Sequence, residues 1–287
     1  MALGNSMGIG IPMVQLGLGG GGAVIDDRFI ISVKTDNAGT SANNQFTLPT
    51  TGGGYNYDIE TSDGQTITGN TGNATITFPS AGEYQLKISG SFPRCYFNSG
   101  GDRLKLLSID NFGIYALGST NQFDAFQDCS NLVITASDVA DFSTVTEFTG
   151  FVRNCPSLTS FPLIDTSNGT RFAQTWRNCS LLTSFPALDF SSVSGNNFEF
   201  FRAWQDCSSL TDFPANMFDA VNTPNFTSAF QNTNLTTQSI DNILVSLDTS
   251  GTINGVISQS GGQAPSATGL SAKDNLVAKG WTVTYTA

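Results

Sequence analysis

The chain has 287 residues, of which 12% are charged, and it carries a formal net charge of −11. Binding to nucleic acid or to an anionic membrane surface needs clustered Lys and Arg, so 12 of these residues against 23 Asp and Glu predict neither partner. Histidine is absent, which removes the commonest general base and metal ligand. We therefore expect no metal and no cofactor. The sequence contains no apolar run of about 18 residues, so no membrane-spanning helix is predicted.

Residues 1–22 are rich in glycine and apolar side chains and end in four consecutive glycines. Such a segment cannot bury a core of its own. It lacks Lys and Arg, and glycine interrupts its apolar run, so it is not predicted to be a secretory signal peptide. Its apolar content favours an arm that docks on another protein chain, and the alternative is a disordered tail. The apolar residues of this arm are Ile9, Ile11, Met13, Val14, Leu16 and Leu18.

Residues 23–94 are predicted to form a small antiparallel β-sandwich. Short apolar or alternating runs occupy 29–33, 46–49, 55–60, 65–68, 74–78 and 84–88, and turn residues separate them. Many short strands between regular turns are typical of such a sandwich. Asp63 and Gly64 lie between two of these runs and predict a hairpin turn. Half of a calcium-binding loop is a weaker alternative for this pair.

Residues 95–235 contain an internal repeat of the form Phe-x3-aromatic-x2-Cys-x2-Leu-x2-Phe-Pro. The cysteine place recurs every 24 to 28 residues, which lies in the range of leucine-rich repeats. A diverged first copy begins at Phe123, and a last copy has Thr233 in the cysteine place. The predicted core residues of the repeats are Phe126, Cys129, Leu132, Phe148, Cys155, Leu158, Phe161, Phe172, Trp176, Cys179, Leu182, Phe185, Phe200, Trp204, Cys207, Leu210 and Phe213.

The spacing within one repeat predicts its local structure. Apolar residues at positions one, five and eight would lie on one face of a short helix. An Asp or Asn always precedes the cysteine place, and these residues tolerate the left-handed conformation that ends a helix. One unit cannot bury its apolar face alone, so the units are expected to stack into a solenoid with contacts between neighbours.

The repeated cysteines are predicted to be a column of buried free thiols. Zinc sites need pairs of ligands at short spacing, which a spacing of 24 to 28 residues does not supply. Disulfides are disfavoured by the odd count of five cysteines and by the threonine that takes the same place in the last copy.

The final segment, 236–287, is predicted to alternate helix and strand and to close the solenoid as a cap. The pattern indicates a helix over 237–247 with Thr236 or Thr237 as its N-cap, and a strand over 253–257. A second helix over 271–278 closes at Gly280, and a strand follows over 281–285. The fold class is therefore α/β plus all-β, in the order arm (1–22), sandwich (23–94), solenoid (95–235) and cap (236–287).

The repeats resemble the BspA-like leucine-rich repeats, because an aromatic-x-Asx-Cys-Ser-x-Leu core recurs at 126–132, 176–182 and 204–210. The stretches 46–49, 57–60, 63–64 and 82–90 resemble a PKD-type, immunoglobulin-like sandwich, without the Trp-Gly that precedes the Asp-Gly pair in that family. Joined by 101–109 and closed by 280–284, the combination is similar to proteins encoded by tailed bacteriophages. This resemblance covers most of 25–287. It implies surface adhesion or virion architecture and carries no catalytic residues.

The resulting hypothesis is a non-enzymatic bacteriophage virion protein, located in the virion and assembled in the host bacterial cytoplasm. It would be a tail fibre or receptor-binding component, or a capsid decoration protein. The arm would bind other virion proteins, and the repeat surface would meet a host-surface glycan or protein. A homo-oligomer is expected, because virion proteins assemble symmetrically.

Two alternatives remain open at this stage. One is a bacterial surface adhesin-like binding module. The other is a tailspike glycan hydrolase, which needs two carboxylates about 5–10 Å apart in a cleft. The acidic residues considered for that role are Asp110, Asp124, Asp138 and Asp141, and turn or cap roles are the favoured interpretation for them.

Overall fold

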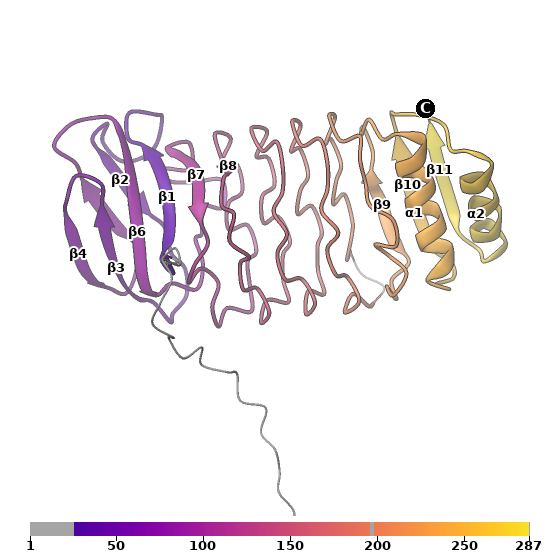
Figure 1. Cartoon of the computed structure of the whole chain (residues 1–287), viewed down its shortest axis with the longest axis horizontal. Coiled ribbons are helices and arrows are strands. Elements are labelled where there is room, and N and C mark those ends of the chain that lie inside the picture. The colour runs from indigo at the N-terminus through magenta and orange to yellow at the C-terminus, as the bar shows by residue number, and fades with distance from the viewer. Residues whose placement is uncertain (1–25, 196–197, 287) are drawn as a thin grey trace, which may run out of the picture.

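The computed structural model describes residues 26–195 and 198–286, and this part of the chain is mostly β with several sheets and two helices. The molecule is elongated, with antiparallel sheets at one end, a stack of coils in the middle and both helices at the other end (Figure 1). No helix within these ranges is long and apolar enough to span a membrane. The arm predicted over residues 1–22 lies outside the described residues.

The N-terminal strands form where the sequence predicts them. Strands β3, β6 and β1 pair antiparallel in the order β4-β3-β6-β1, while β2 and β5 form a separate antiparallel pair. The turn between β3 and β4 contains Gly64 in a left-handed conformation, as the Asp-Gly pair predicts. The strand bounds are β1 Phe29–Lys34, β2 Gln45–Leu48, β3 Asn56–Thr61, β4 Thr66–Asn70, β5 Ala74–Thr77 and β6 Glu83–Ser91.

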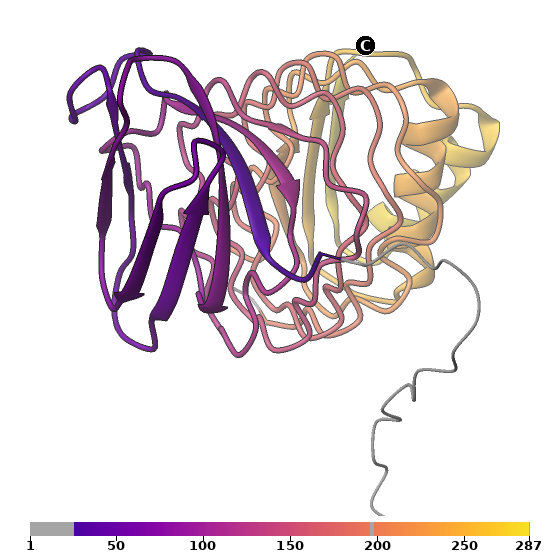
Figure 2. The ribbon, with the colours of Figure 1, turned by 60° about the vertical axis from the view of Figure 1, so that its left-hand side comes forward.

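The larger sheet continues into the stacked coils. Strand β7 (Leu106–Asn111) pairs antiparallel with β1 and parallel with β8 (Val133–Ile134). The six strands therefore follow the order β4-β3-β6-β1-β7-β8, and the view in Figure 2 shows this sheet leading into the coils. The hydrophobic core also crosses residue 94, since the ring of Phe29 in β1 lies 4.6 Å from that of Tyr115 between their centroids.

A buried ion pair fastens a loop of the N-terminal sheets to the first coil. The side chains of Asp102 and Lys105 are fully buried, with Nζ 3.9 Å from Oδ1. Lys105 Nζ also donates to the carbonyl oxygens of Ser41 and Gln45 and to Ser41 Oγ. Asp102 accepts the backbone N–H of Ser41 and of Thr47. Every charge is therefore compensated locally, which a buried pair requires to be tolerated.

The repeats form nested turns, so the predicted short helices are wrong. Within 26–195 and 198–286, no helix precedes α1 (Thr237–Thr249). The Asp or Asn before each cysteine place is left-handed, as predicted, with φ between 58° and 63°. A second left-handed residue lies four positions earlier in each coil, for example Gln174 before Asn178. This additional reversal breaks a continuous helix, yet the apolar residues still face inward.

Backbone hydrogen bonds join each coil to the next through alternate residues. The N–H groups of Gly150, Val152 and Asn154 donate to the carbonyls of Ala173, Thr175 and Arg177. The N–H groups between them stay within their own coil, as Arg153 does by donating to the Gly150 carbonyl. The same alternation recurs in the following coils. Each coil therefore finds partners for many of its backbone N–H and C=O groups in the neighbouring coil.

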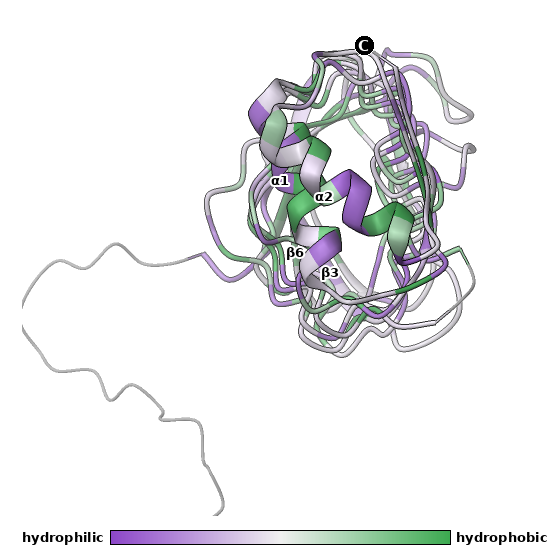
Figure 3. Ribbon diagram, turned by 90° about the vertical axis from the view of Figure 1, so that its right-hand side faces the viewer, coloured by the Kyte–Doolittle hydropathy of each residue, from purple (hydrophilic) through white to green (hydrophobic). Residues whose placement is uncertain are grey.

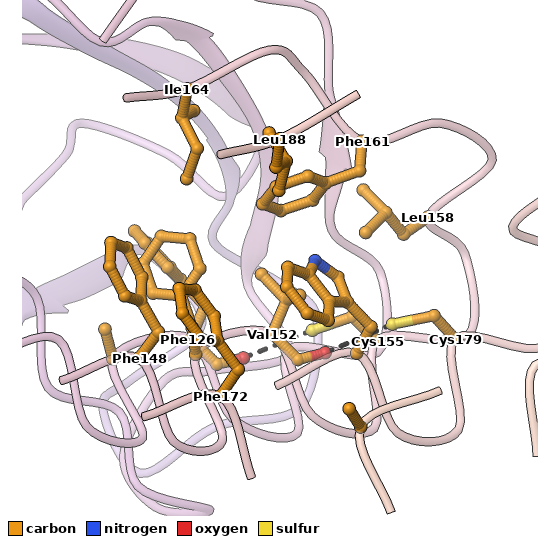
Figure 4. Close-up of a cluster of buried hydrophobic side chains, with 14 of the residues drawn as sticks. Phe126, Phe148, Val152, Cys155, Leu158, Phe161, Ile164, Phe172, Cys179 and Leu188 are labelled. Carbon is orange, nitrogen blue, oxygen red and sulfur yellow. Dashed lines mark hydrogen bonds between the residues drawn. The ribbon is translucent and has the colours of Figure 1, made fainter. Parts of the chain in front are cut away.

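Aromatic side chains repeat inside the stack as ladders of parallel rings. Phe148, Phe172 and Phe200 form one ladder, with successive ring centroids 5.0 and 5.8 Å apart. Trp176 and Trp204 form another, with centroids 5.1 Å apart and planes 8° from parallel. Phe148 and Phe172, the first two rings of the phenylalanine ladder, lie in the packed interior in Figure 4. Offset-stacked rings of this kind stabilise a core by more than the burial of their area alone.

The repeated cysteines form a column of buried free thiols. Sγ of Cys155, of Cys179 and of Cys207 lies 3.1–3.3 Å from a backbone carbonyl of the preceding coil, and the first two of these bonds are dashed in Figure 4. Thr233 instead donates within its own coil, to the carbonyl of Phe230. The thiols are thus small core residues that also bridge successive coils.

A parallel βαβαβ segment covers the C-terminal end of the stack. Strand β9 (Asn225–Phe230) belongs to the last repeat and pairs with β10 (Val256–Ser260), which pairs with β11 (Thr282–Thr286). Figure 3 views this end and shows α1 and α2 packed together. Helix α1 has Thr236 as its N-cap, as expected. Helix α2 spans Ala267–Ala278, so it begins earlier than expected, at the Ser266 cap.

The Asp102–Lys105 pair predicts a pH-dependent contribution to stability. Burial alone raises the pKa of Asp102, but hydrogen bonds from Ser41 and Thr47 and the charge of Lys105 outweigh it and lower the pKa. A carboxylate with a lowered folded-state pKa stabilises above its unfolded pKa of about 3.9 and stops doing so as the pH falls through the folded value. Asp102→Asn should cost about 3–5 kcal/mol at pH 7 and clearly less at pH 3. Urea unfolding at both pH values measures this, and equal losses would contradict it.

The ladder of rings predicts unequal effects of two substitutions at Trp204. The indole N–H of Trp204 is buried without a hydrogen-bond partner, and Phe230 occupies the next rung in parallel, 4.9 Å away. Trp204→Ala should cost about 3–5 kcal/mol through the cavity it leaves. Trp204→Phe keeps the stacking, removes the unpaired donor and should cost much less. Denaturant unfolding compares the two, and equal costs would show that stacking contributes little.

The thiol column predicts resistance to labelling. Burial raises the pKa of the Cys155 and Cys207 thiols well above the usual range and that of Cys179 to about 12. Because the thiolate is the reactive form, a maleimide should not modify these residues in the native protein at pH 7.5. All of them should react rapidly after denaturation. Mass spectrometry of the native and denatured samples tests this, and rapid native labelling would refute the buried column.

Candidate ligand-binding groove

The repeat core residues predicted from sequence support the fold and cannot themselves meet a partner. Each of these residues, from Phe126 to Phe213, is buried. The apolar residues of the predicted arm lie outside the described part of the chain. A site on the repeats would therefore use the outward-facing residues of the coils, which the repeat pattern leaves variable.

The neighbouring acidic residues Asp138 and Asp141 act as turn and cap residues. Asp138 accepts the backbone N–H of Phe112 and of Gly113, at 2.8–3.0 Å. Asp141 accepts the backbone N–H of Ser143, and this bond together with the hydroxyl of the same serine lowers the pKa of Asp141. Both carboxylates are thus committed to the backbone.

The other two acidic residues, Asp110 and Asp124, contact side chains instead. Asp110 accepts the hydroxyls of Ser32 and Ser108, each at 2.6 Å. Asp124 is buried, and this burial raises the pKa of its carboxyl. One carboxylate oxygen of Asp124 lies 3.8 Å from the guanidinium of Arg153. No cluster of three or more His, Cys, Asp or Glu side chains suited to a metal occurs within 26–195 and 198–286.

A groove of about 310 Å³ crosses the outer face of the coils. Phe123 lies at one end of this aromatic groove, with 40% of its surface exposed, and Phe198 lies at the other, with 61% exposed. Thr149 and Ala173 occupy the place of Phe123 in the two coils between these ends. Their side chains are smaller than a phenylalanine ring and form the floor at the centre of the groove. The remaining lining residues are Glu147, Arg171, Gln174 and Phe201.

The stacking of the coils places these residues together. Thr149, Ala173 and Phe201 occupy the same place in successive coils, because the N–H donors of Asp124, Gly150 and Gln174 each reach the next coil's carbonyl at that place. Glu147 and Arg171 form parallel bridges in a neighbouring row. Adjacent strands are separated by about 4.8 Å, so the floor from Phe123 to Phe201 spans about 14 Å.

The charged wall of the groove is electrically balanced. Arg171 Nη1 lies 3.5 Å from Glu147 Oε2, and the side chain of Arg171 is 54% exposed. Glu147 Oε1 accepts the backbone N–H of Thr149 at 2.9 Å, which fixes the carboxylate. The pair therefore offers a fixed carboxylate and an exposed guanidinium, with no net charge.

The Phe198 end of the groove combines aromatic rings with an amide. The rings of Phe198 and Phe201 meet edge to face, with centroids 5.2 Å apart, and the Arg202 guanidinium lies 4.7 Å from the centroid of Phe201. Gln174 Oε1 accepts from both Arg153 and Arg177. That orientation leaves the Gln174 NH2 group as the end of the amide available to donate.

The repeat pattern missed this site and misplaced one of its residues. Phe123 was expected to begin the first copy of the core, but the place seven residues before Cys129 belongs to Gln122, which is fully buried. There the side-chain oxygen of Gln122 accepts a hydrogen bond from the hydroxyl of Tyr115, and its NH2 group donates to the carbonyl of Pro93. Phe123 therefore turns outward. Phe198 and Phe201 flank the buried Phe200 in the same way, so aromatic residues just off the repeat register were the available signal.

Comparisons of the chain with protein-family models, with curated proteins and with solved structures found no match. The likeness to BspA-like repeats and to phage proteins therefore depends on the sequence motifs alone. The aromatic groove offers exposed rings beside charged and amide side chains on the surface of the described residues.

Proposed function

We propose that this chain is a non-enzymatic bacteriophage virion protein that presents a BspA-type leucine-rich-repeat surface to a partner. It serves as a tail fibre or receptor-binding component, or as a decoration protein on the capsid. Residues 1–22 attach it to other virion proteins, and the copies assemble as a homo-oligomer. Its role is adhesion or protein contact, with no cofactor.

The observation that carries this proposal is the aromatic groove on a stack of repeats. Exposed rings at Phe123 and Phe198, beside the Glu147–Arg171 pair, are the mixture of apolar area and polar groups that binding sites use. The coils beneath are rigidly joined by backbone hydrogen bonds. A preorganised surface loses little conformational freedom when it binds.

The chemistry of the groove supports binding over glycan hydrolysis. Glycosidases use two carboxylates on either side of the bond that breaks, whereas the groove is lined by one, that of Glu147. This carboxylate is held by Arg171 and by the N–H of Thr149. Asp124 is buried and faces the guanidinium of Arg153, and Asp138 accepts backbone N–H groups of Phe112 and Gly113.

The proposal predicts that the protein is a component of the phage particle. Particles purified from a host that produces this chain should contain it at a fixed copy number, measured by quantitative mass spectrometry. Cryo-electron microscopy of the same particles then locates it on the tail or on the capsid. Its absence from purified particles would refute the virion role and favour an adhesin of the bacterial surface.

Deletion of residues 1–22 tests how the protein is attached. The truncated protein should unfold at the same denaturant concentration as the full chain, because a segment so rich in glycine cannot bury a core of its own. It should be lost from purified particles. A matched control replaces the exposed Leu163 by Ala and should be incorporated normally. Normal incorporation of the truncated protein would show that attachment uses another surface.

A further inference from the structure

We propose that the aromatic groove binds an uncharged, hydroxyl-rich polysaccharide, whose chain runs across the coils from Phe123 to Phe198. This inference deepens the proposed function by naming the ligand class, and it rests on that function for its biological setting.

The ends of the groove suit the faces of sugar rings. Phe123 is 40% and Phe198 61% exposed, and exposed apolar side chains that gather in one groove with polar residues around them mark an interaction site. An aromatic face carries negative charge and attracts the slightly positive C–H groups of a sugar. The coils of Phe123 and Phe198 lie three coil spacings apart, about 14 Å along the stack, so one ligand that reaches both ends must be a chain of several units.

The polar groups of the groove match hydroxyls. A hydroxyl both donates and accepts, and the groove offers both functions side by side. Arg171 carries five N–H donors, of which one group contacts Glu147, while the Glu147 carboxylate offers acceptor oxygens. Gln174 adds an NH2 donor, because its oxygen is already bound by Arg153 and Arg177.

The backbone beneath the groove disfavours an extended peptide as the ligand. A peptide strand is usually recognised through free main-chain groups at a sheet edge. Here the carbonyls of Thr149, Ala173 and Phe201 already accept N–H groups from the preceding coils. Recognition has to come from side chains, which is the mode that suits a sugar chain.

The charge of the groove favours a neutral ligand. Its lining contains one acidic and one basic side chain, Glu147 and Arg171, and these face each other at 3.5 Å. The whole chain carries a net charge of −11, which repels polyanions at long range. Acidic polysaccharides would find no unbalanced cation in this lining to offset that repulsion.

The experiment is a binding screen with the full-length chain on an array of neutral and acidic bacterial polysaccharides. Hits are confirmed by titration calorimetry and by saturation-transfer NMR. Neutral glycans should bind, and Phe198→Ala and Phe123→Ala should each weaken that binding at least tenfold. Phe198→Trp retains a larger aromatic face and should bind at least as well as the natural protein. Arg171→Gln should also weaken binding, by loss of donors.

Matched controls separate ligand binding from folding. Leu163 is exposed to a similar degree, at 56%, but lies outside the groove, so Leu163→Ala should leave binding unchanged. All of these variants alter exposed side chains and should unfold at the same denaturant concentration as the natural protein. A variant that unfolds earlier is replaced by the milder Phe198→Leu, for which the loss of an aromatic face should still weaken binding.

Three results would overturn the inference. They are binding of acidic glycans alone, binding that Phe198→Ala does not change, and binding by no neutral glycan on the array. Peptide binding that Phe198→Ala abolishes would assign the groove to a protein partner instead. The virion role is tested separately, since Phe198→Ala should still be incorporated into particles. Loss of glycan binding with normal incorporation would concern the groove, whereas absence of the natural protein from particles would concern the proposed function.

Discussion

The backbone hydrogen bonds between successive coils are the constraint on which the rest of this structure depends. They exist because two residues in each coil, four positions apart, adopt the left-handed conformation. Alternate N–H groups then point out of the coil toward the next one, as those of Gln174, Trp176 and Asn178 do. Asx residues reach this conformation at low cost, and Gly150 takes it where a side chain would collide with Asp124. A coil on its own would leave these groups without partners.

This constraint explains how the interior is filled. Coils that are held in register bring the same side chain of each repeat into line, so that Phe148 stacks on Phe172 and Trp176 on Trp204. The buried thiols follow the same rule, since Cys179 reaches the carbonyl of Val152 in the coil before it. Side-chain packing and backbone pairing thus reinforce the same register, which is the consistency expected of a sequence that specifies one structure.

The constraint also explains the two ends of the stack. The outermost coils would expose unpaired backbone groups and a hydrophobic cross-section. At the N-terminal end, β7 joins the first coils to the antiparallel sheet, and the buried Asp102–Lys105 pair fastens a neighbouring loop. At the C-terminal end, β10 continues the pairing and α1 packs its buried Ile240 and Leu247 inward. The surface between these ends is free to vary, and the aromatic groove lies there.

The sequence by itself determined the elements whose signals are local. Strands such as β1 and β6, the hairpin at Gly64 and the α1 cap at Thr236 were predictable, because alternation, turn residues and capping residues act within a few positions. The repeat spacing likewise predicted the burial of residues such as Phe172, Trp176 and Cys179, though not the exposure of Phe123, and it predicted that the Asx before each cysteine place is left-handed.

Only the tertiary structure decided the features that depend on neighbouring coils. The spacing of Phe172, Trp176 and Cys179 fits a helix and nested turns equally well, and the pairing of backbone groups with the next coil selects the turns. The joining of β7 to β1 brings together residues more than seventy positions apart. The groove arises for the same reason: Phe123 and Phe198 share no local pattern, and they share one surface because the register of the stack places them along it.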